Sequence, residues 1–302
     1  MSRKLLALAC AVAALTAGCA SAGSAGSGDK PVVVATTTQV ADIARDVGGS
    51  DVSVEQILQP NTDPHEYEPR PGDAVAVSRA KVVLRSGGDV DTWLNGVLDQ
   101  ANTGATVVDL GASVKRRGQD PHWWQDPRNG ELATQAVASA LAAADPRHAA
   151  GYRQRAHAYT TKLKALDGSI ARCMASVPTT KRRLVTNHDA LEYFAHRYGV
   201  TIVGVVIPSL STAAGTSAGE TAKLVKTIRR EGVREIFPES SVPKGVEAAV
   251  AKEAGAKLGP ALYADSLGPK GSPGATYIGS LRFNAGAMAD GFSGRTGSCR
   301  LP

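Results

Sequence analysis

Cysteine is scarce in this chain, with four residues among 302. None of the four stands in a CxxC or zinc-finger spacing, which argues against a metal site built from thiolates. Cys10 and Cys19 belong to the N-terminal apolar region. Cys173 and Cys299 remain, and an even number of cysteines in an exported chain predicts a disulfide, with two separate thiols as the alternative. The bond would close a loop of more than a hundred residues and contribute roughly 4–5 kcal/mol of stability in the chain-entropy model.

Aromatic residues are also few, at 5% of the chain, and the net charge is +6. Lysine and arginine form two short clusters, at 115–117 and 181–183, and neither is interleaved with aromatic residues. A nucleic-acid-binding surface usually shows a basic stripe along one face. The sequence therefore predicts no nucleic-acid partner, and both clusters are typical of solvated loops.

The apolar run at residues 5–15 is too short to serve as a permanent membrane span. It follows Arg3 and Lys4 and has the length of a signal-peptide core. Small residues then precede Cys19, as they do before a processing site. We therefore predict that residues 1–18 are a signal peptide and that the folded part is exported.

The processing site itself resembles a bacterial lipobox, in the sequence Leu15-Thr16-Ala17-Gly18-Cys19, although Thr16 stands where leucine is usual. If Cys19 becomes the first residue, its acyl chains supply the two hydrophobic signals that stable anchoring needs. Residues 19–30, rich in Ser, Gly and Ala, then form a flexible tether. The predicted location is the outer face of the cell membrane, and the alternative is a plain secretory signal cleaved nearby.

Beyond the tether, short β-branched runs alternate with segments of helical spacing in both halves of the chain. Strands are predicted at residues 31–37, 52–58, 81–85, 106–110, 183–186, 201–207, 235–238 and 261–263. Helices are predicted at residues 39–47, 71–80, 91–100, 129–144, 190–198, 219–231, 242–254 and 280–292. This alternation predicts an α/β fold with parallel sheets and helices on both faces.

One long amphipathic pattern, from about residue 147 to 175, lies between the two halves. Its apolar residues recur at three- and four-residue steps, which predicts a helix of roughly 42 Å. We interpret it as a rigid connector at residues 146–176. It would join an N-terminal lobe at 31–145 to a C-terminal lobe at 177–302.

Histidine is rare too, with six residues, and two of them lie in the same tripeptide, Asp-Pro-His. His65 and His122 each follow a proline, which fixes φ and keeps the preceding residue extended. Two stiff histidine loops indicate a pre-built metal site, and two ordinary surface loops are the alternative. His148, His157 and His196 lie in predicted helices and are interpreted as solvated residues.

Like the two loop histidines, His188 and Asp265 lie in segments that come after predicted strands. Each follows a predicted strand, and in parallel sheets ligands bind beyond the C-terminal ends of the strands. Three imidazoles and one carboxylate would suit tetrahedral zinc. For His188 alone, a cap on the helix that starts at Ala190 is the simpler interpretation.

Four motifs occur in this order along the chain: Asp63-Pro64-His65-Glu66-Tyr67-Glu68-Pro69, Asp120-Pro121-His122-x-Trp124-x-Asp126-Pro127, His188-Asp189-Ala190-x-x-Tyr193-Phe194-Ala195-x-x-Tyr198-Gly199 and Tyr263-x-Asp265-Ser266-Leu267. Together they resemble the zinc- and manganese-binding receptors of bacterial ABC transporters, the cluster A-I or periplasmic zinc-uptake family. The resemblance implies two α/β lobes joined by one rigid helix. It also implies metal ligation by His65, His122, His188 and Asp265, delivery to an ABC permease, and a monomer without enzymatic activity.

The choice of metal depends on His188, because manganese-selective relatives usually carry Glu there. Imidazole suits zinc and oxygen ligands suit manganese, so we predict Zn²⁺ as the cargo, with Mn²⁺ as the alternative. Many zinc-selective relatives have a His-rich loop before the second motif. Residues 111–119 occupy that place here and contain no histidine.

Two other classes of function are weighed against transport. A zinc hydrolase would keep one coordination position open for water, whereas four ligand candidates fill the tetrahedron here. Glu66, Glu68 and Glu239 could serve as general bases, but no HExxH motif accompanies them. A lipid-anchored adhesin is the second alternative, and lipid anchoring suits it equally well.

Overall fold

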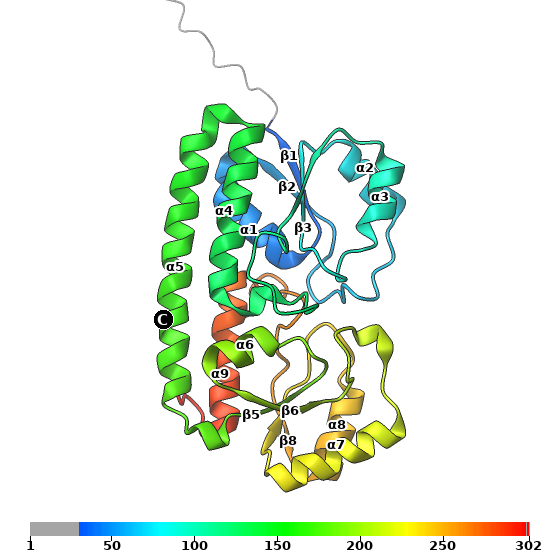
Figure 1. Ribbon diagram of the computed structural model, residues 1–302, viewed down its shortest axis with the longest axis vertical. Helices are drawn as coiled ribbons and strands as arrows, with labels where there is room; N and C mark the ends of the chain where they lie inside the picture. The colour runs from blue at the N-terminus through cyan, green and yellow to red at the C-terminus, as the bar shows by residue number, and fades with distance from the viewer. Residues whose placement is uncertain (1–29, 300, 302) are drawn as a thin grey trace, which may run out of the picture.

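Four short parallel strands form the sheet of the N-terminal lobe, in the order β2-β1-β3-β4. Their bounds are β1 (Val32–Ala35), β2 (Ser53–Gln56), β3 (Val82–Arg85) and β4 (Thr106–Asp109). Val33 pairs with Val54 on one side and Val82 on the other. The computed structural model describes residues 30–299 and 301. Within them the chain forms two lobes, one above the other (Figure 1).

Helices cover both faces of this sheet, as the sequence predicts. Their bounds are α1 (Thr38–Gly48), α2 (Pro71–Ser78), α3 (Leu94–Ala101) and α4 (Pro127–Ala144). Val33 and Val82 belong to the core that includes α1 and α4. Val34 and Val83, one residue further along each strand, pack with side chains of α2 and α3. Alternate residues of a strand point to opposite faces, so a sheet buried on both sides needs such continuous apolar strands.

The C-terminal lobe again alternates strands with helices. Its strands are β5 (Arg183–Thr186), β6 (Thr201–Val205), β7 (Glu235–Ile236) and β8 (Lys257–Leu258), and the last two have only two residues each. β5 pairs with β6 and β7 with β8, all parallel. The Phe237 N–H donates to the Val185 carbonyl at 3.0 Å and places β7 beside β5. The helices of this half are α6 (Glu192–Tyr198), α7 (Ala218–Glu231), α8 (Gly245–Ala254) and α9 (Tyr277–Ser293). Short 3₁₀ turns lie at η1 (Gly49–Asp51), η2 (Trp123–Gln125), η3 (Pro146–His148), η4 (Thr179–Lys181) and η5 (Thr212–Ala214).

The predicted last strand, at residues 261–263, is wrong. The regular pairing ends at Leu258, and only an isolated parallel bridge between Leu262 and Glu239 continues it. The Gly259 N–H donates to the Ile236 carbonyl, and the next donor to this neighbour is Leu262, whose N–H bonds the Pro238 carbonyl, both at 2.8 Å. Three residues of the segment therefore span two of its partner, and the regular register is lost around Pro260. The sheet is therefore interrupted just before the chain reaches Asp265.

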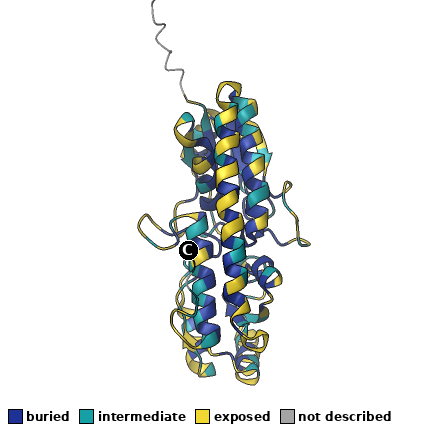
Figure 2. Ribbon diagram, turned by 90° about the vertical axis from the view of Figure 1, so that its left-hand side faces the viewer, coloured by how far each residue is buried: buried dark blue, intermediate teal, exposed yellow. Residues whose placement is uncertain are grey.

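Helix α5 (Ala149–Ala175) has 27 residues and runs beside both lobes (Figure 1). Its buried residues follow the predicted spacing, including Tyr152, Tyr159, Leu163 and Ile170. Figure 2 looks onto the side that α5 covers, where exposed residues face outward and buried residues turn toward the lobes. At 1.5 Å per residue the helix is about 40 Å long, so one element packs against the cores of both lobes.

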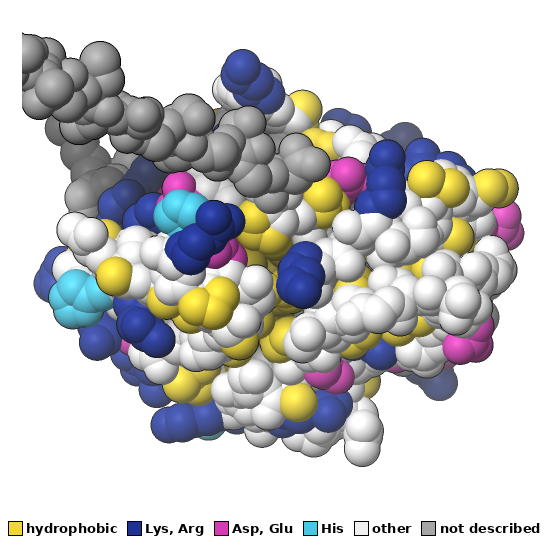
Figure 3. Space-filling view, turned by 90° about the horizontal axis from the view of Figure 1, so that it is seen from above, with side chains coloured by type: hydrophobic (Ala, Val, Ile, Leu, Met, Phe, Trp, Pro, Cys, Tyr) yellow, Lys and Arg dark blue, Asp and Glu magenta, His cyan; other side chains and the backbone are white. Residues whose placement is uncertain are grey.

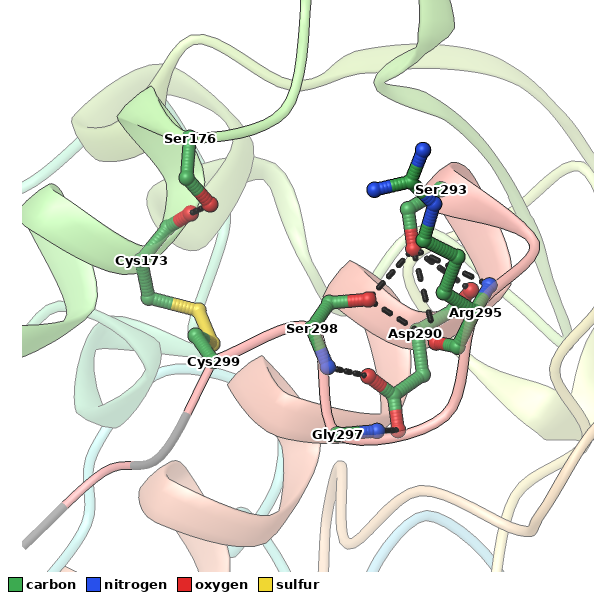
Figure 4. The surroundings of a disulfide bond; sticks show 8 residues. All are labelled: Cys173, Ser176, Asp290, Ser293, Arg295, Gly297, Ser298 and Cys299. Carbon is green, nitrogen blue, oxygen red and sulfur yellow. Dashed lines mark hydrogen bonds between the residues drawn. A yellow bond between two sulfur atoms is a disulfide. The ribbon is translucent and has the colours of Figure 1, made fainter.

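The predicted disulfide between Cys173 and Cys299 is present, with a Cα–Cα distance of 5.3 Å (Figure 4). It ties the C-terminal tail to the last turns of α5. The tail is also fixed by Asp290, whose carboxylate accepts the N–H groups of Gly297 (2.8 Å) and Ser298 (2.6 Å). The bond closes a separation of 126 residues.

The signal peptide, Cys19 and nearly all of the tether lie outside the described residues, which begin at Lys30. Figure 3 looks down on the end of the molecule where the described chain begins, and there Lys and Arg side chains outnumber Asp and Glu. Among residues 30–299, no helix is both long and apolar enough to span a membrane.

Candidate metal centre

His65, His122, His188 and Asp265 converge between the two lobes. One ligand atom from each can be chosen so that all four lie within 4.8 Å of one another. His65 and His122 come from loops after β2 and β4, whereas His188 follows β5 and Asp265 follows β8. All four positions lie beyond the C-terminal ends of strands, where parallel sheets place ligands.

The carboxylate of Asp265 lies at the centre of the group. Its Oδ2 is 3.2 Å from His65 Nε2 and 3.1 Å from His188 Nε2, and its Oδ1 is 3.4 Å from His122 Nε2. The Nε2 atoms of His65 and His122 are 3.4 Å apart. A tetrahedron with ligands at 2.0–2.1 Å from the metal has edges of about 3.3 Å. These separations therefore fit one small cation held by four donors.

The group is shielded from solvent. The side chain of His65 is 2% exposed, and those of His122, His188 and Asp265 are fully buried. Both Asp265 oxygens and His188 Nε2 have no hydrogen-bond partner among the described residues. Buried polar atoms normally have partners, and a cation bound between the four side chains would satisfy these atoms together.

The charges of the group shift the proton affinities of its members. Burial lowers the pKa of His65, but the Asp265 carboxylate 3.2 Å from its Nε2 outweighs burial and raises the pKa above the usual value. Burial likewise opposes protonation of His188, yet the charges of Asp265 and Glu239 raise its pKa well above the usual range. Burial raises the pKa of Asp265, but His188 and His122 hold it well below its usual value. A cation that binds the imidazole nitrogens of His65 and His188 must displace any proton that these nitrogens carry.

Three acidic residues hold the histidine loops in position. Asp120 Oδ1 lies 2.7 Å from His122 Nδ1 and also accepts the His122 N–H at 2.9 Å. Glu239 Oε2 lies 3.0 Å from His188 Nδ1. Asp63 Oδ1 accepts the His65 backbone N–H at 2.9 Å. An acceptor at Nδ1 keeps the proton there and leaves Nε2 free to ligate. Asp120 bonds His122 in this way, and Glu239 lies close enough to His188 Nδ1 to act on that imidazole through its charge.

Sequence reasoning missed these orienting roles, although the signal was present for Asp120. It precedes His122 by two residues in the repeated Asp-Pro-His tripeptide, as Asp63 precedes His65. For Glu239 the sequence suggests only the role of a general base. It is 2% exposed and also accepts the Ser241 hydroxyl at 2.5 Å, so its contacts are those of a buried orienting group.

The segment that carries Asp265 is bonded to the N-terminal lobe. The Ala264 carbonyl accepts the indole N–H of Trp124 and the amide of Gln125, both at 2.7 Å. The Leu267 N–H donates to Thr38 Oγ1 at 2.8 Å, and the Asn61 N–H donates to the Leu267 carbonyl at 3.1 Å. These bonds flank Asp265 on both sides and fix it against the loops of the other lobe.

The remaining histidines lie apart from the group. His148, His157 and His196 are exposed, as expected for solvated residues. His148 contacts Asp145 Oδ2 at 2.5 Å. Glu66 and Glu68, the other candidate bases of a hydrolase, are exposed as well.

Comparisons with known proteins match most of this chain. The model of the family described as "Zinc-uptake complex component A periplasmic" matches residues 33–291. The metal ABC transporter substrate-binding lipoprotein FimA of Streptococcus parasanguinis is 29% identical, covering 91% of this chain and 93% of its own. The iron-binding protein YfeA of Yersinia pestis is 31% identical over 86% of both chains. The structure of the periplasmic zinc-binding protein TroA of Treponema pallidum superposes with a TM-score of 0.81 at 28% identity, covering 87% of this chain and 99% of that one.

Proposed function

Because this chain belongs to the periplasmic zinc-uptake component A family, a family of metal-binding transport receptors and not of enzymes, we propose that it captures Zn²⁺ between its lobes. It then delivers the ion to an ABC permease. The ligands in this proposal are His65, His122, His188 and Asp265. The observation that supports it most strongly is the convergence of these side chains, with one ligand atom from each within 4.8 Å of the others and four measured separations of 3.1–3.4 Å.

The donor set favours zinc over manganese. Three imidazole nitrogens and one carboxylate suit a tetrahedral zinc ion, whereas manganese prefers more oxygen donors. The names of the relatives point to different metals, iron for YfeA and zinc for TroA. The preference for zinc in this proposal therefore rests on the donor set. Elemental analysis followed by competitive titration of zinc and manganese into the purified soluble domain tests this directly. Tighter binding of manganese than of zinc would overturn the assignment.

Capture and release would involve small movements. Helix α5 packs along both lobes and limits hinge opening, so the loops and slight tilts of the lobes would open the site. Zn²⁺ would bind as protons leave His65 and His188. The bonds from Trp124 and Gln125 to Ala264 would keep Asp265 close to the N-terminal loops during these movements.

The proposed location is the outer face of the cell membrane, with Cys19 as the lipidated residue and the chain as a monomer. FimA is described as a lipoprotein, and the lipobox-like sequence before Cys19 is consistent with that chemistry. Mass spectrometry of the protein extracted from membranes should show acyl chains on Cys19. A water-soluble product cleaved elsewhere would support the plain secretory signal instead.

A further inference from the structure

A basic cleft of about 280 Å³ lies beside the second histidine loop. It is bounded by the loop at 115–117, the start of α4 and one face of α6. Its lining includes Lys115, Arg116, Arg117, Arg128, Tyr193 and His196. The cleft therefore spans the junction between an N-terminal loop and a C-terminal helix.

Three of the cations in this cleft are uncompensated. Asp126 is the one acidic lining residue, and its carboxylate is occupied by Arg128 at 2.6 Å. Within the described chain, Lys115, Arg116 and Arg117 form no ion pair. A concave surface with an excess of positive charge attracts anions.

The loop that carries these cations is fixed at two points. The buried side chain of Asn129 accepts the Lys115 N–H at 3.1 Å and donates to the Lys115 carbonyl at 3.3 Å. The Tyr193 hydroxyl accepts the Arg117 N–H at 2.8 Å and donates to the Asp120 carbonyl at 3.1 Å. Because the backbone is already ordered, a ligand would not have to supply that ordering free energy.

We propose that this cleft binds a small multivalent anion bearing carboxylate or phosphate-like groups. Arginine suits both, because its planar guanidinium donates two parallel hydrogen bonds to such groups. The volume of about 280 Å³ accommodates a small molecule. The cluster at 115–117, which the sequence suggested to be a solvated loop, thereby becomes one wall of a binding site.

The anion would be coupled to the metal through one short turn. The Asp120 N–H donates to the Arg117 carbonyl at 3.1 Å, and Asp120 in turn holds His122 Nδ1. An anion that bridges Arg117 and α6 would restrain this turn and the lobe junction together. This coupling rests on the proposed metal site, and it predicts slower zinc release when the anion is bound.

Calorimetric titration of the metal-free mature protein with sulfate and with succinate, at low ionic strength, tests the anion site itself. Sulfate represents phosphate-like groups and succinate represents carboxylates. Neither anion chelates zinc strongly. We expect saturable binding that Arg116→Gln/Arg117→Gln weakens about tenfold, since each exposed charge contact contributes roughly a factor of two to five. The matched control, Lys223→Gln/Lys226→Gln, removes two exposed charges from α7 and should leave binding unchanged.

Absence of saturable binding, or equal weakening by both double variants, would overturn the proposal. In the second case the charges would act only through the net electrostatic potential of the protein.

The coupling has its own readout, the rate of zinc loss to an excess of chelator. Sulfate should slow that rate in the wild type and not in Arg116→Gln/Arg117→Gln. Unchanged zinc release despite bound anion would refute the coupling, and failure of the zinc assignment would leave the anion titration interpretable.

Discussion

The substitution Glu239→Gln tests whether a buried carboxylate sets the zinc affinity without touching the ion. Glu239 Oε2 is 3.0 Å from His188 Nδ1, and its Oε1 accepts the Ser241 hydroxyl and the Asp265 N–H. Glutamine has the same shape but only one acceptor oxygen. If that oxygen keeps the bonds from Ser241 and Asp265, the amide N–H₂ faces His188 Nδ1 and favours a proton on Nε2 instead.

Such a change of tautomer removes a ligand lone pair from the metal. Loss of a residue that orients a metal-bound histidine typically weakens metal affinity by 10- to 100-fold, which corresponds to about 1.4–2.7 kcal/mol. We expect an effect of this size in a competition titration with a fluorescent zinc chelator at pH 7.5. The same substitution should lower the pKa of His188 in the metal-free protein, because Glu239 is one of the charges that raise it.

The control is Ser241→Ala, which removes the other strong bond to the same carboxylate and leaves the Oε2 contact intact. Its zinc affinity should stay within about threefold of the wild type, since it loses one hydrogen bond of ordinary strength remote from the ion. Both variants must retain the far-ultraviolet circular dichroism of the wild type. Wild-type affinity in a folded Glu239→Gln variant would refute the orienting role.

Further predictions concern protons, burial and the crosslink. Zinc binding near neutral pH should release protons in a weakly buffered titration, because raised pKa values extend the protonated forms of His65 and His188 to higher pH in the metal-free protein; no release would contradict those shifts. For the same reason, the metal-free protein should gain stability from these two residues below about pH 6.5 and lose it as the pH rises through their raised pKa values, as thermal melts at a series of pH values will show. Burial raises the pKa of Asp42 to about 6, so Asp42→Asn should stabilise the protein at pH 8 by about 2–3 kcal/mol, a gain that should vanish below about pH 4. Cys173→Ser/Cys299→Ser should lower the free energy of unfolding by about 4–5 kcal/mol while zinc affinity stays the same, and a large loss of affinity would show that the crosslink shapes the site.

Much of the fold follows from local patterns. The β-branched runs predicted strands β1, β3 and β5 because these three strands are largely buried, and the apolar spacing of α5 predicted its buried side. The error at residues 261–263 arose because apolar residues continue past Pro260, whereas the hydrogen-bond register shifts there by one residue and leaves only the bridge at Leu262. Pairing depends on backbone donors as well as on side-chain patterning.

For the metal centre, residue type and position after strands predicted which side chains meet. The contacts that orient these side chains were harder to predict from the sequence. The bond from Asp120 is local, but Glu239 reaches His188 from another strand, and Trp124 reaches Ala264 across 140 residues. Such contacts depend on the packing of the lobes, which no local pattern specifies.

The central claim is that four side chains hold one zinc ion, and X-ray absorption at the zinc edge of the loaded protein tests it most directly. We expect four nitrogen and oxygen ligands at about 2.0–2.1 Å, with the outer-shell scattering of three imidazoles. His188→Ala should lose one imidazole from that pattern. Six oxygen-rich ligands in the wild type, or an unchanged spectrum in His188→Ala, would contradict the account.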